Sequence, residues 1–394
     1  MHFIHPAVRV FGPDYFQDTD AEYARLRSQF PAVPADLPGR RGRPWLITRY
    51  DGVRAALADP RLFKDFRKVS PVSGTGAFAT NMLDTDPPDH ERLRRLVAAA
   101  FTPRRVELLR PRISSIASEL LSAMEGLSEV DLIDAFAFPL PVTVICELLG
   151  IPVDDRDKFR AWTAELLSDT SVPVQARAAS QGMSDYFQAL ISERRDVPAD
   201  DMVTALIQAR DHEDQLSENE LIAMLFLLLV AGHETTVNLI ASGTLALLTH
   251  PAALSRLRSD PSLLPSAVEE LLRFTSPVSH GTFRMTGCPV TVGNVIIPEH
   301  RQVWPLISSA NRDPARFPRP DEVDLDRDPS GHLAFGHGIH YCLGAPLARL
   351  EAVTAFGQLL ARFPALSLAV PASSLRWRES SLIHSLTTLP VRLR

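Results

Sequence analysis

The most informative stretch of this chain reads Phe335-Gly336-His337-Gly338-Ile339-His340-Tyr341-Cys342-Leu343-Gly344. It presents one cysteine in a glycine-rich loop, and the apolar periodicity from Ala345 to Leu360 predicts that a helix follows. The positive end of that helix would stabilise a thiolate at Cys342, which favours a bond to a metal over a free thiol. The three glycines favour tight turns and the close approach of a flat group.

This loop resembles the haem-binding loop of the cytochrome P450 family, whose pattern is Phe-x-x-Gly-x-(His/Arg)-x-Cys-x-Gly, and every fixed position of that pattern is present. The resemblance implies that Cys342 is the axial ligand of the haem iron and that Phe335 and Gly344 contact the cofactor. In this family the thiolate donates electron density that favours O–O cleavage. His337, His340 and Cys342 could instead hold a small zinc site, but zinc would leave the glycines unexplained.

A second motif, Ala231-Gly232-His233-Glu234-Thr235-Thr236, lies at the end of the longest apolar run. A glycine inside a helix costs about 1 kcal/mol relative to alanine, and threonine hydroxyls compete for backbone carbonyls, so we interpret this break as functional. The motif matches the P450 pattern (Ala/Gly)-Gly-x-(Asp/Glu)-Thr. The resemblance implies that Glu234 and Thr235 deliver protons during oxygen activation and that Ala231 faces the haem. A kinked core helix is the alternative, and His233 is expected to pack away from the haem.

Four basic side chains match the family positions that bind the haem propionates. His90 and Arg94 are four residues apart and would face the same way on one helix, while Arg284 and His340 lie further along the chain. Exposed surface charges are the alternative for each of them. The segment Glu270-Leu271-Leu272-Arg273 matches the Glu-x-x-Arg of the family, which implies a structural ion pair that locks its helix to the coil before the cysteine loop.

Substrate contacts are expected from the family pattern and from the apolar stripe of the long helix. The segment Ser73 to Met82, rich in glycine and small polar residues, resembles the variable substrate loop of P450 enzymes. The candidate substrate contacts are Phe78, Met82, Leu227, Val230, Val278 and Ile383. They imply a small, largely apolar ligand held by few fixed polar contacts.

The composition is typical of a soluble globular protein, with 394 residues, 45% of them hydrophobic and 22% charged. No linker, repeat or composition shift divides the chain, so we expect a single domain over residues 1–394. The first residues lack the layout of a secretion signal. The longest apolar run, Leu221 to Gly232, is about half of what a membrane crossing requires, and three scattered cysteines do not suggest disulfides. We therefore expect a cytoplasmic protein without a membrane segment.

The net charge of −6 disfavours nucleic-acid binding. One region is nevertheless basic, with Arg92, Arg94, Arg95, Arg104, Arg105, Arg110 and Arg112. Gly74-x-Gly76-x-x-Ala79 is similar to a dinucleotide loop, but no apolar strand precedes it. Without a flavin or nicotinamide domain, electrons from NAD(P)H would have to arrive through separate redox proteins. The resemblance implies a small acidic ferredoxin and its reductase, which the basic region would suit.

The periodicity predicts a mainly α fold with a minor β region, which is also the fold that the resemblance implies: a P450-like domain with a long central helix over the haem. Ser217 and Glu220 form a capping box that starts this helix, and it would run to about His250. The other predicted elements are a strand at 45–48, a helix at 50–58, a helix after Pro88, helices from 103 to 210 interrupted by a strand at 130–133, a helix at 263–274, strands within 277–307, a long coil at 311–329 and a closing hairpin at 376–392.

Together these features predict a haem-thiolate monooxygenase that inserts one atom of O2 into a small apolar substrate by hydroxylation or epoxidation. Its non-covalent cofactor would be haem b, since no Cys-x-x-Cys-His is present. Tailoring of secondary metabolites is the expected role by analogy. The alternatives are a peroxide-driven or oxidative-coupling haem-thiolate enzyme and a non-catalytic haem-fold module that recruits a partner.

Overall fold

The computed structural model of the chain describes residues 8–9, 15–36, 43–68, 78–211 and 216–394. Helices account for 58% and strands for 10%, which confirms the mainly α class with a minor β region. The chain forms two compact units. The first, here called the sheet unit, comprises Met1–Lys64, Ala241–Cys342 and Leu366–Leu389, and the second, the helical unit, comprises the remaining stretches. Each unit is built from separate stretches of the chain. The single domain over residues 1–394 stays a prediction.

The sheet unit contains a six-stranded sheet of order β1-β2-β3-β9-β6-β4. Its strands are β1 (Val8–Arg9), β2 (Ala32–Asp36), β3 (Trp45–Ile47), β9 (Gln302–Pro305), β6 (Arg284–Thr286) and β4 (Leu62–Phe63). Strand β3 pairs parallel with β9 and antiparallel with β2, with Trp45 opposite Val303 and Pro34. All three residues of β3 are buried, as expected for a central strand with both faces covered. A separate hairpin joins β7 (Val290–Val292) to β8 (Val295–Ile297).

Helices complete the sheet unit: α1 (Thr19–Gln29), α2 (Tyr50–Ala58), α11 (Pro251–Ser259), α12 (Leu264–Thr275) and α13 (Ile307–Asn311). Helix α2 packs on β9 and α13, and it buries Val53 and Leu57 on its inner face. These two side chains sit in a core with Ile47, Val303 and Phe317. The apolar residues of α2 therefore form one buried face, as their spacing predicts, and this face packs the helix against the sheet.

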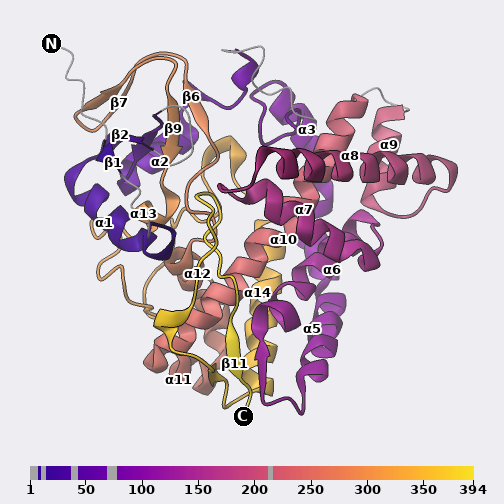
Figure 1. Ribbon diagram of the computed structural model, residues 1–394, viewed down its shortest axis with the longest axis vertical. Coiled ribbons are helices and arrows are strands. Elements are labelled where there is room, and N and C mark those ends of the chain that lie inside the picture. Colours follow the sequence, from indigo (N-terminus) through magenta and orange to yellow (C-terminus); the bar gives the residue numbers. More distant parts are fainter. Residues whose placement is uncertain (1–7, 10–14, 37–42, 69–77, 212–215) are drawn as a thin grey trace. The chain divides into compact units, whose positions relative to one another are not determined.

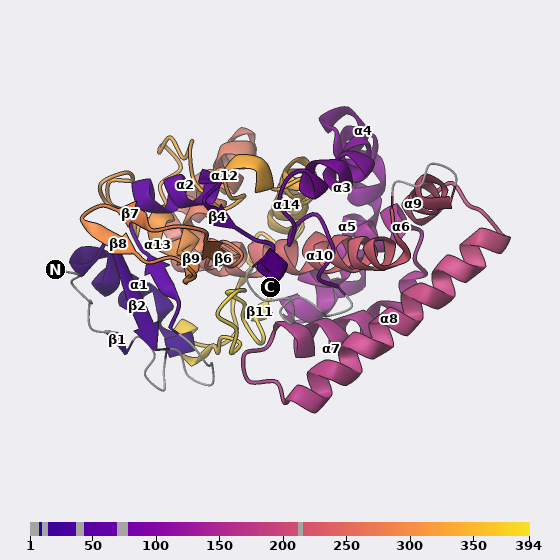
Figure 2. The same ribbon diagram turned by 90° about the horizontal axis from the view of Figure 1, so that it is seen from above.

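The helical unit contains α3 (Asp89–Ala98), α4 (Pro103–Leu108), α5 (Arg110–Met124), α6 (Pro139–Leu149), α7 (Arg156–Leu167), α8 (Pro173–Asp196), α9 (Met202–Asp211) and α14 (Ala345–Arg362). Figure 1 labels these helices except α4, which is labelled in Figure 2. Helix α14 packs on α4 and α5, and α7 runs beside α8, as Figure 2 shows. A strand pair closes this unit, with β5 (Glu129–Asp131) antiparallel to β11 (Pro390–Arg392).

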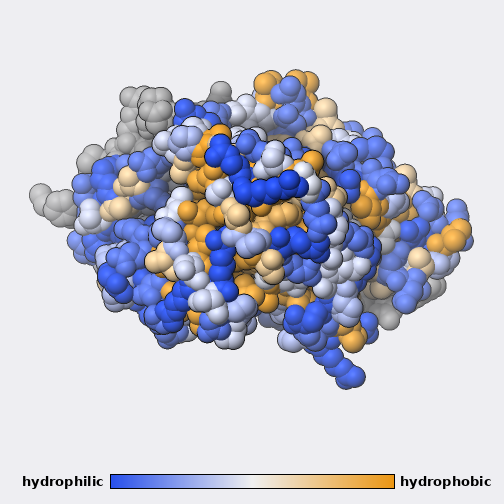
Figure 3. Space-filling model, turned by 90° about the horizontal axis from the view of Figure 1, so that it is seen from below, coloured by the Kyte–Doolittle hydropathy of each residue, from blue (hydrophilic) through white to orange (hydrophobic). Residues whose placement is uncertain are grey.

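Helix α10 (Glu218–Thr249) is the longest element, with 32 residues. Its start is the predicted capping box: the Ser217 amide donates to Glu220 Oε2 at 2.7 Å, and the Glu220 amide donates to Ser217 Oγ at 3.2 Å. By length and composition alone α10 could cross a membrane, but 72% of its most apolar window is buried inside the protein. Core helices of soluble proteins have this character. On the face seen in Figure 3, hydrophilic residues surround a central group of hydrophobic ones.

Two predicted elements differ from the structure. The strand expected at 130–133 is Glu129–Asp131, because a π-helix from Ile133 to Ala137 follows it directly. The closing hairpin at 376–392 was predicted wrongly in its second half. Only one bridge, Trp377 with Leu386, joins the two arms, and the final strand pairs with β5 instead. A local turn pattern cannot identify a partner strand more than 250 residues away in sequence, whose pairing is set by tertiary structure.

Candidate active site

The cysteine loop is a compact turn held by its own backbone. The amide of Cys342 donates to the carbonyl of Phe335 at 2.9 Å, and a short 3-10 helix, Gly338–His340, lies between them. Gly336 and Gly338 have φ angles of +73° and +77°, so two of the three glycines are required by the backbone. Gly344 also lies in a turn, as expected, but its φ of −80° is one that other residues adopt as well. Phe335 is buried and Cys342 is exposed.

The coil before the loop is anchored from its first residue. Asn311 Oδ1 accepts the amide of Leu333 at 2.7 Å, and Asn311 Nδ2 donates to the hydroxyl of Ser276 at 2.9 Å. One buried amide therefore ties the end of α12 to the segment that leads into Phe335. Such contacts hold the long coil at 311–329, which contains no helix or strand beyond Asn311, the last residue of α13.

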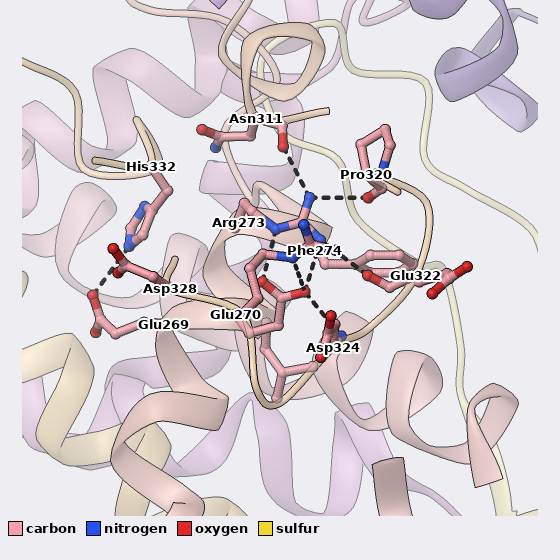
Figure 4. Close-up of polar contacts among 12 residues, drawn as sticks. Glu269, Glu270, Arg273, Phe274, Asn311, Pro320, Glu322, Asp324, Asp328 and His332 are labelled. Atoms are coloured by element: carbon pink, nitrogen blue, oxygen red, sulfur yellow. Dashed lines mark hydrogen bonds and ion pairs between the residues drawn. The ribbon is translucent and has the colours of Figure 1, made fainter. Parts of the chain in front are cut away.

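Glu270 and Arg273 form a fully buried ion pair that also binds the coil (Figure 4). Arg273 donates to both oxygens of Glu270 at 2.7 and 2.8 Å, and its remaining hydrogens reach three backbone carbonyls, those of Asn311, Pro320 and Glu322. Glu270 in turn accepts the amide of Asp324 and the Nε of Arg327. The second arginine on Glu270 is not part of the Glu-x-x-Arg pattern, so sequence reasoning missed it.

The second motif lies in the middle of α10 and leaves one small residue uncovered. Ala231 is exposed, whereas residues 221–230 are buried or half-buried. Thr235 Oγ1 donates to the carbonyl of Ala231 at 3.2 Å. A methyl group on Gly232 would lie 2.6 Å from Ile145 of α6, so this glycine also has a packing reason that the sequence did not reveal. The helix stays continuous through the motif.

Two acidic side chains lie at this part of α10, and sequence reasoning found only one of them. Glu234 is buried, with Oε1 3.7 Å from Nε2 of the buried His233. Glu351 of α14 is 1% exposed, and neither of its oxygens has a hydrogen-bond partner of ordinary geometry among the described residues. Desolvation raises the pKa of Glu351 well above its usual range, and the neighbouring Thr236 hydroxyl offsets this only in part. Burial therefore favours the protonated, neutral form of the Glu351 carboxyl.

The four basic candidates divide between the units. In the helical unit, His90 is buried and its Nδ1 donates to the carbonyl of Met82 at 2.7 Å, and Arg94 is half-buried on the same helix. In the sheet unit, Arg284 is buried and donates to the carbonyls of Thr282 and Leu57, whereas His340 is half-buried in the cysteine loop. Their shared role at the propionates stays a prediction.

The substrate candidates also form two groups. In the helical unit, the ring of Phe78 stacks on Phe226 of α10 with centroids 3.9 Å apart, and the amide of Met82 contacts the sulfur of Met224. Leu227 and Val230 are buried on the same helix. In the sheet unit, Val278 and Ile383 are partners in an antiparallel bridge. Phe226 and Met224 were not among the candidates, although they follow the helical spacing of the predicted apolar stripe.

Some sequence features cannot be followed in the structure. Most of the expected substrate loop (residues 73–77) and the glycines of the dinucleotide-like pattern, Gly74 and Gly76, lie outside the described residues. In the part of the chain that is described, no group of three or more His, Cys, Asp or Glu side chains could hold a metal ion. This finding does not support the zinc alternative for His337, His340 and Cys342.

The arginine-rich region is partly neutralised within the helical unit. Arg92 pairs with Glu220, Arg110 with Glu107 and Arg112 with Glu147. Arg95, Arg104 and Arg105 are exposed, and none of them has an ion pair with another described residue. Leu108, 73% exposed, lies on the same short helix as Arg104 and Arg105. Fewer arginines are thus available to bind a partner than the sequence suggested.

Comparison with known proteins places these features in one family. The family model described as cytochrome P450 matches residues 43–368. Cytochrome P450 107B1 of Saccharopolyspora erythraea is 51% identical, with 98% of both chains covered. The monooxygenase PikC of Streptomyces venezuelae is 46% identical, with 97% of this chain and 93% of that protein covered. The tirandamycin C-bound P450 monooxygenase TamI matches with a TM-score of 0.93 and 47% identity over 98% of this chain and all of that one.

This chain belongs to the cytochrome P450 family, and it is a P450 monooxygenase. Related proteins include 6-deoxyerythronolide B hydroxylase, mycinamicin IV hydroxylase/epoxidase and the polyketide biosynthesis cytochrome P450 PksS. Members of the family use haem iron and receive electrons from redox partners. The residues present fit such a cofactor: the cysteine thiol is exposed at the end of an ordered loop, and Ala231 leaves an uncovered patch on an otherwise buried helix.

Proposed function

We propose that this P450 hydroxylates or epoxidises a small, largely apolar secondary metabolite of the polyketide or macrolide type. The tailoring enzymes among its relatives support the substrate class. The apolar side chains of Phe78, Phe226, Leu227 and Val230 support a ligand with few polar groups. The observation that carries the proposal is the acid–alcohol pair Glu234-Thr235 beside the exposed Ala231, since oxygen activation needs a proton source next to an apolar surface.

Cys342 would bind the iron of a non-covalent haem b, with Phe335 and Gly344 beside it. When bound, the haem supplies the activation of O2 and the transfer of one oxygen atom to the substrate. His90, Arg94, Arg284 and His340 would neutralise its propionates. Because Nδ1 of His90 is bonded to the Met82 carbonyl, Nε2 is the ring nitrogen that would meet a propionate.

Glu234 and Thr235 would supply the protons of the reaction. The bond from Thr235 Oγ1 to the Ala231 carbonyl fixes the direction of this hydroxyl, so its oxygen lone pairs stay available to accept a proton. Glu234, the residue before Thr235, is buried and would be the acid that donates a proton to this hydroxyl. Electrons would come from NAD(P)H through a reductase and an acidic ferredoxin that docks on Arg95, Arg104 and Arg105 in the cytoplasm.

The ligand proposal is tested by reducing the purified protein and adding carbon monoxide. The spectrum of a thiolate-bound haem is expected, and Cys342→His should convert it to that of a histidine-bound haem. A histidine-type spectrum in the unchanged protein would reject Cys342 as the ligand. This measurement does not depend on knowing the substrate.

The proton role is tested by Thr235→Ala. Consumption of NAD(P)H should continue, but most of it should end in peroxide, with product per NAD(P)H falling by about tenfold or more. Thr249→Ala is the matched control, because Thr249 Oγ1 makes the same bond to the carbonyl four residues before it, at 2.8 Å, on the same helix. Full coupling in Thr235→Ala would contradict the relay.

A further inference from the structure

His233 lies next to the proposed proton donor and is held in one orientation. Its Nδ1 is 2.7 Å from the carbonyl of Leu229, one turn earlier on α10. The ring packs edge-on against Phe138, with centroids 6.0 Å apart and an interplanar angle of 83°. The side chain is 0% exposed, so neither ring nitrogen reaches bulk water. This histidine therefore has one fixed rotamer and one fixed direction for its second nitrogen.

The contacts decide where the protons of this ring are. A carbonyl oxygen can only accept, so Nδ1 must carry a hydrogen. Nε2 is buried without a hydrogen-bond partner among the described residues, and Glu234 Oε1 lies 3.7 Å from it. A neutral imidazole would direct a lone pair at an ionised carboxylate, which is repulsive and leaves Nε2 unsatisfied. One additional proton on the pair removes this repulsion and turns it into attraction between opposite charges.

Few other charges compete for that proton. Arg160 of α7 lies over the Phe138 ring, with its guanidinium carbon 4.6 Å from the ring centroid, but it is already paired with Asp134. Glu351 of α14 lies near Thr236, and burial raises the pKa of its carboxyl, which disfavours a second negative charge here. The ion-pair contact recorded for the His233 side chain is with Glu234. The carboxylate of Glu234 is thus the group that decides the charge on this imidazole.

We propose that His233 and Glu234 act as one proton-holding pair, in which a proton rests on His233 Nε2 and passes to the Glu234 carboxylate on demand. The N–H bond at Nε2 breaks, an O–H bond at Oε1 forms, and Glu234 then donates onward. A proton from solvent, entering through Glu234, whose side chain is 8% exposed, restores the imidazolium. His233 is a positioning residue, because it acts only through Glu234. The proposal rests on the proposed role of Glu234 as proton donor.

The protonation state can be measured without turnover, by nitrogen NMR of ¹⁵N-histidine-labelled protein in its diamagnetic ferrous–carbon monoxide form. The His233 resonances are identified by their loss in His233→Asn. At pH 7 both ring nitrogens should be protonated in the unchanged protein, and only Nδ1 in Glu234→Gln. His250 is the internal control, because its Nδ1 contacts the Ala246 carbonyl at 2.7 Å and its ring packs edge-on against Phe274, yet it has no carboxylate partner among the described residues. Its state should not respond to Glu234→Gln.

Turnover supplies the second readout. His233→Asn should lower product per NAD(P)H by about tenfold and change the solvent isotope effect, whereas His250→Asn should change neither. His233→Gln, which keeps a donor towards Glu234 but cannot titrate, should behave like His233→Asn, and it replaces that variant if the asparagine protein fails to bind haem. A neutral His233 in the unchanged protein overturns the proposal. Full coupling in Glu234→Gln would instead reject the proposed role of Glu234, so the two failures are distinguishable.

Discussion

Arg92 Nη2 lies 2.5 Å from Glu220 Oε1, and this ion pair joins α3 to the capping box of α10. The arginine also contacts Asp89, three residues earlier on its own helix. Reversing the charge of Arg92 would therefore disturb a helix start as well as a surface. Residues that carry positive charge without an internal partner are better probes of partner binding.

Arg104→Glu combined with Arg105→Glu should slow reduction of the protein by an acidic ferredoxin. Both side chains are exposed, and steering by such charges sets association rates, so about a tenfold loss is expected at low ionic strength. The defect should shrink as salt is added, because a Debye length falls to about 8 Å at physiological ionic strength. Stopped-flow reduction at several salt concentrations measures it.

The matched control is Arg110→Glu combined with Arg112→Glu. It changes the net charge by the same amount, but both arginines are already neutralised by Glu107 and Glu147. A smaller effect is expected from this pair. Equal effects of the two double variants would mean that only the overall charge matters, and no effect in either would reject this surface.

Glu351→Gln should stabilise the protein increasingly as the pH rises. Below the usual glutamate pKa both the folded and the unfolded chain hold the proton. Above it only the unfolded chain releases the proton, because burial raises the pKa of Glu351 in the folded state. The wild-type free energy of unfolding therefore decreases with rising pH, by about 1.4 kcal/mol per unit until the raised pKa is reached. Glutamine removes this dependence.

Thermal melting of both proteins between about pH 5 and about pH 7 measures the difference. The control is Glu119→Gln, since Glu119 is exposed on α5. A melting difference between Glu351→Gln and the unchanged protein that stays constant with pH would show that Glu351 is ionised in the fold.

Arg273→Ala should lower the free energy of unfolding by about 3 to 5 kcal/mol. The buried Glu270 carboxylate would keep only one arginine partner, and three backbone carbonyls would lose their hydrogen-bond donor. Arg273→Lys should recover little of that, since one ammonium cannot replace the planar fork. Chemical unfolding and haem retention on heating would measure both. Arg319→Ala, which removes exposed ion pairs with Glu322 and Asp324, should cost less than about 1 kcal/mol. An equal loss of unfolding free energy in Arg319→Ala would show that burial of the ion pair does not set its contribution to stability.

Local sequence patterns predicted the elements well wherever their own residues determine them. Helix α2 spans Tyr50–Ala58 as predicted, and the capping box at Ser217 and Glu220 has the expected bonds. The capping-box bonds join residues three apart, and the apolar spacing that identifies α2 is also a local pattern. The coil at 311–329 was also predicted, because proline and charge exclude regular structure there.

Features that depend on distant residues were missed. Glu351 looked like an ordinary helix glutamate, since only packing removes it from water. Arg327 joins Glu270 across more than 50 residues, and Ile145 explains Gly232 from another helix. The pairing of the closing strand was predicted wrongly for the same reason, because its partner β5 is distant in sequence. No motif records such pairings.

His300→Gly should stabilise the protein by about 1 kcal/mol, because His300 has a φ of +58°, which L-residues other than glycine adopt at a cost of about 1 to 2 kcal/mol. The segment Pro298-Glu299-His300 stands where the family usually has Pro-Ala-Gly, so the strain coincides with a departure from the family pattern. The side chain is exposed, and its Nε2 lies 3.4 Å from Oε1 of the neighbouring Glu299. His300→Ala is the control, since alanine removes that contact but keeps the strain. Chemical unfolding should rank the glycine variant above both others, and equal stability of the glycine and alanine variants would reject backbone strain as the cause.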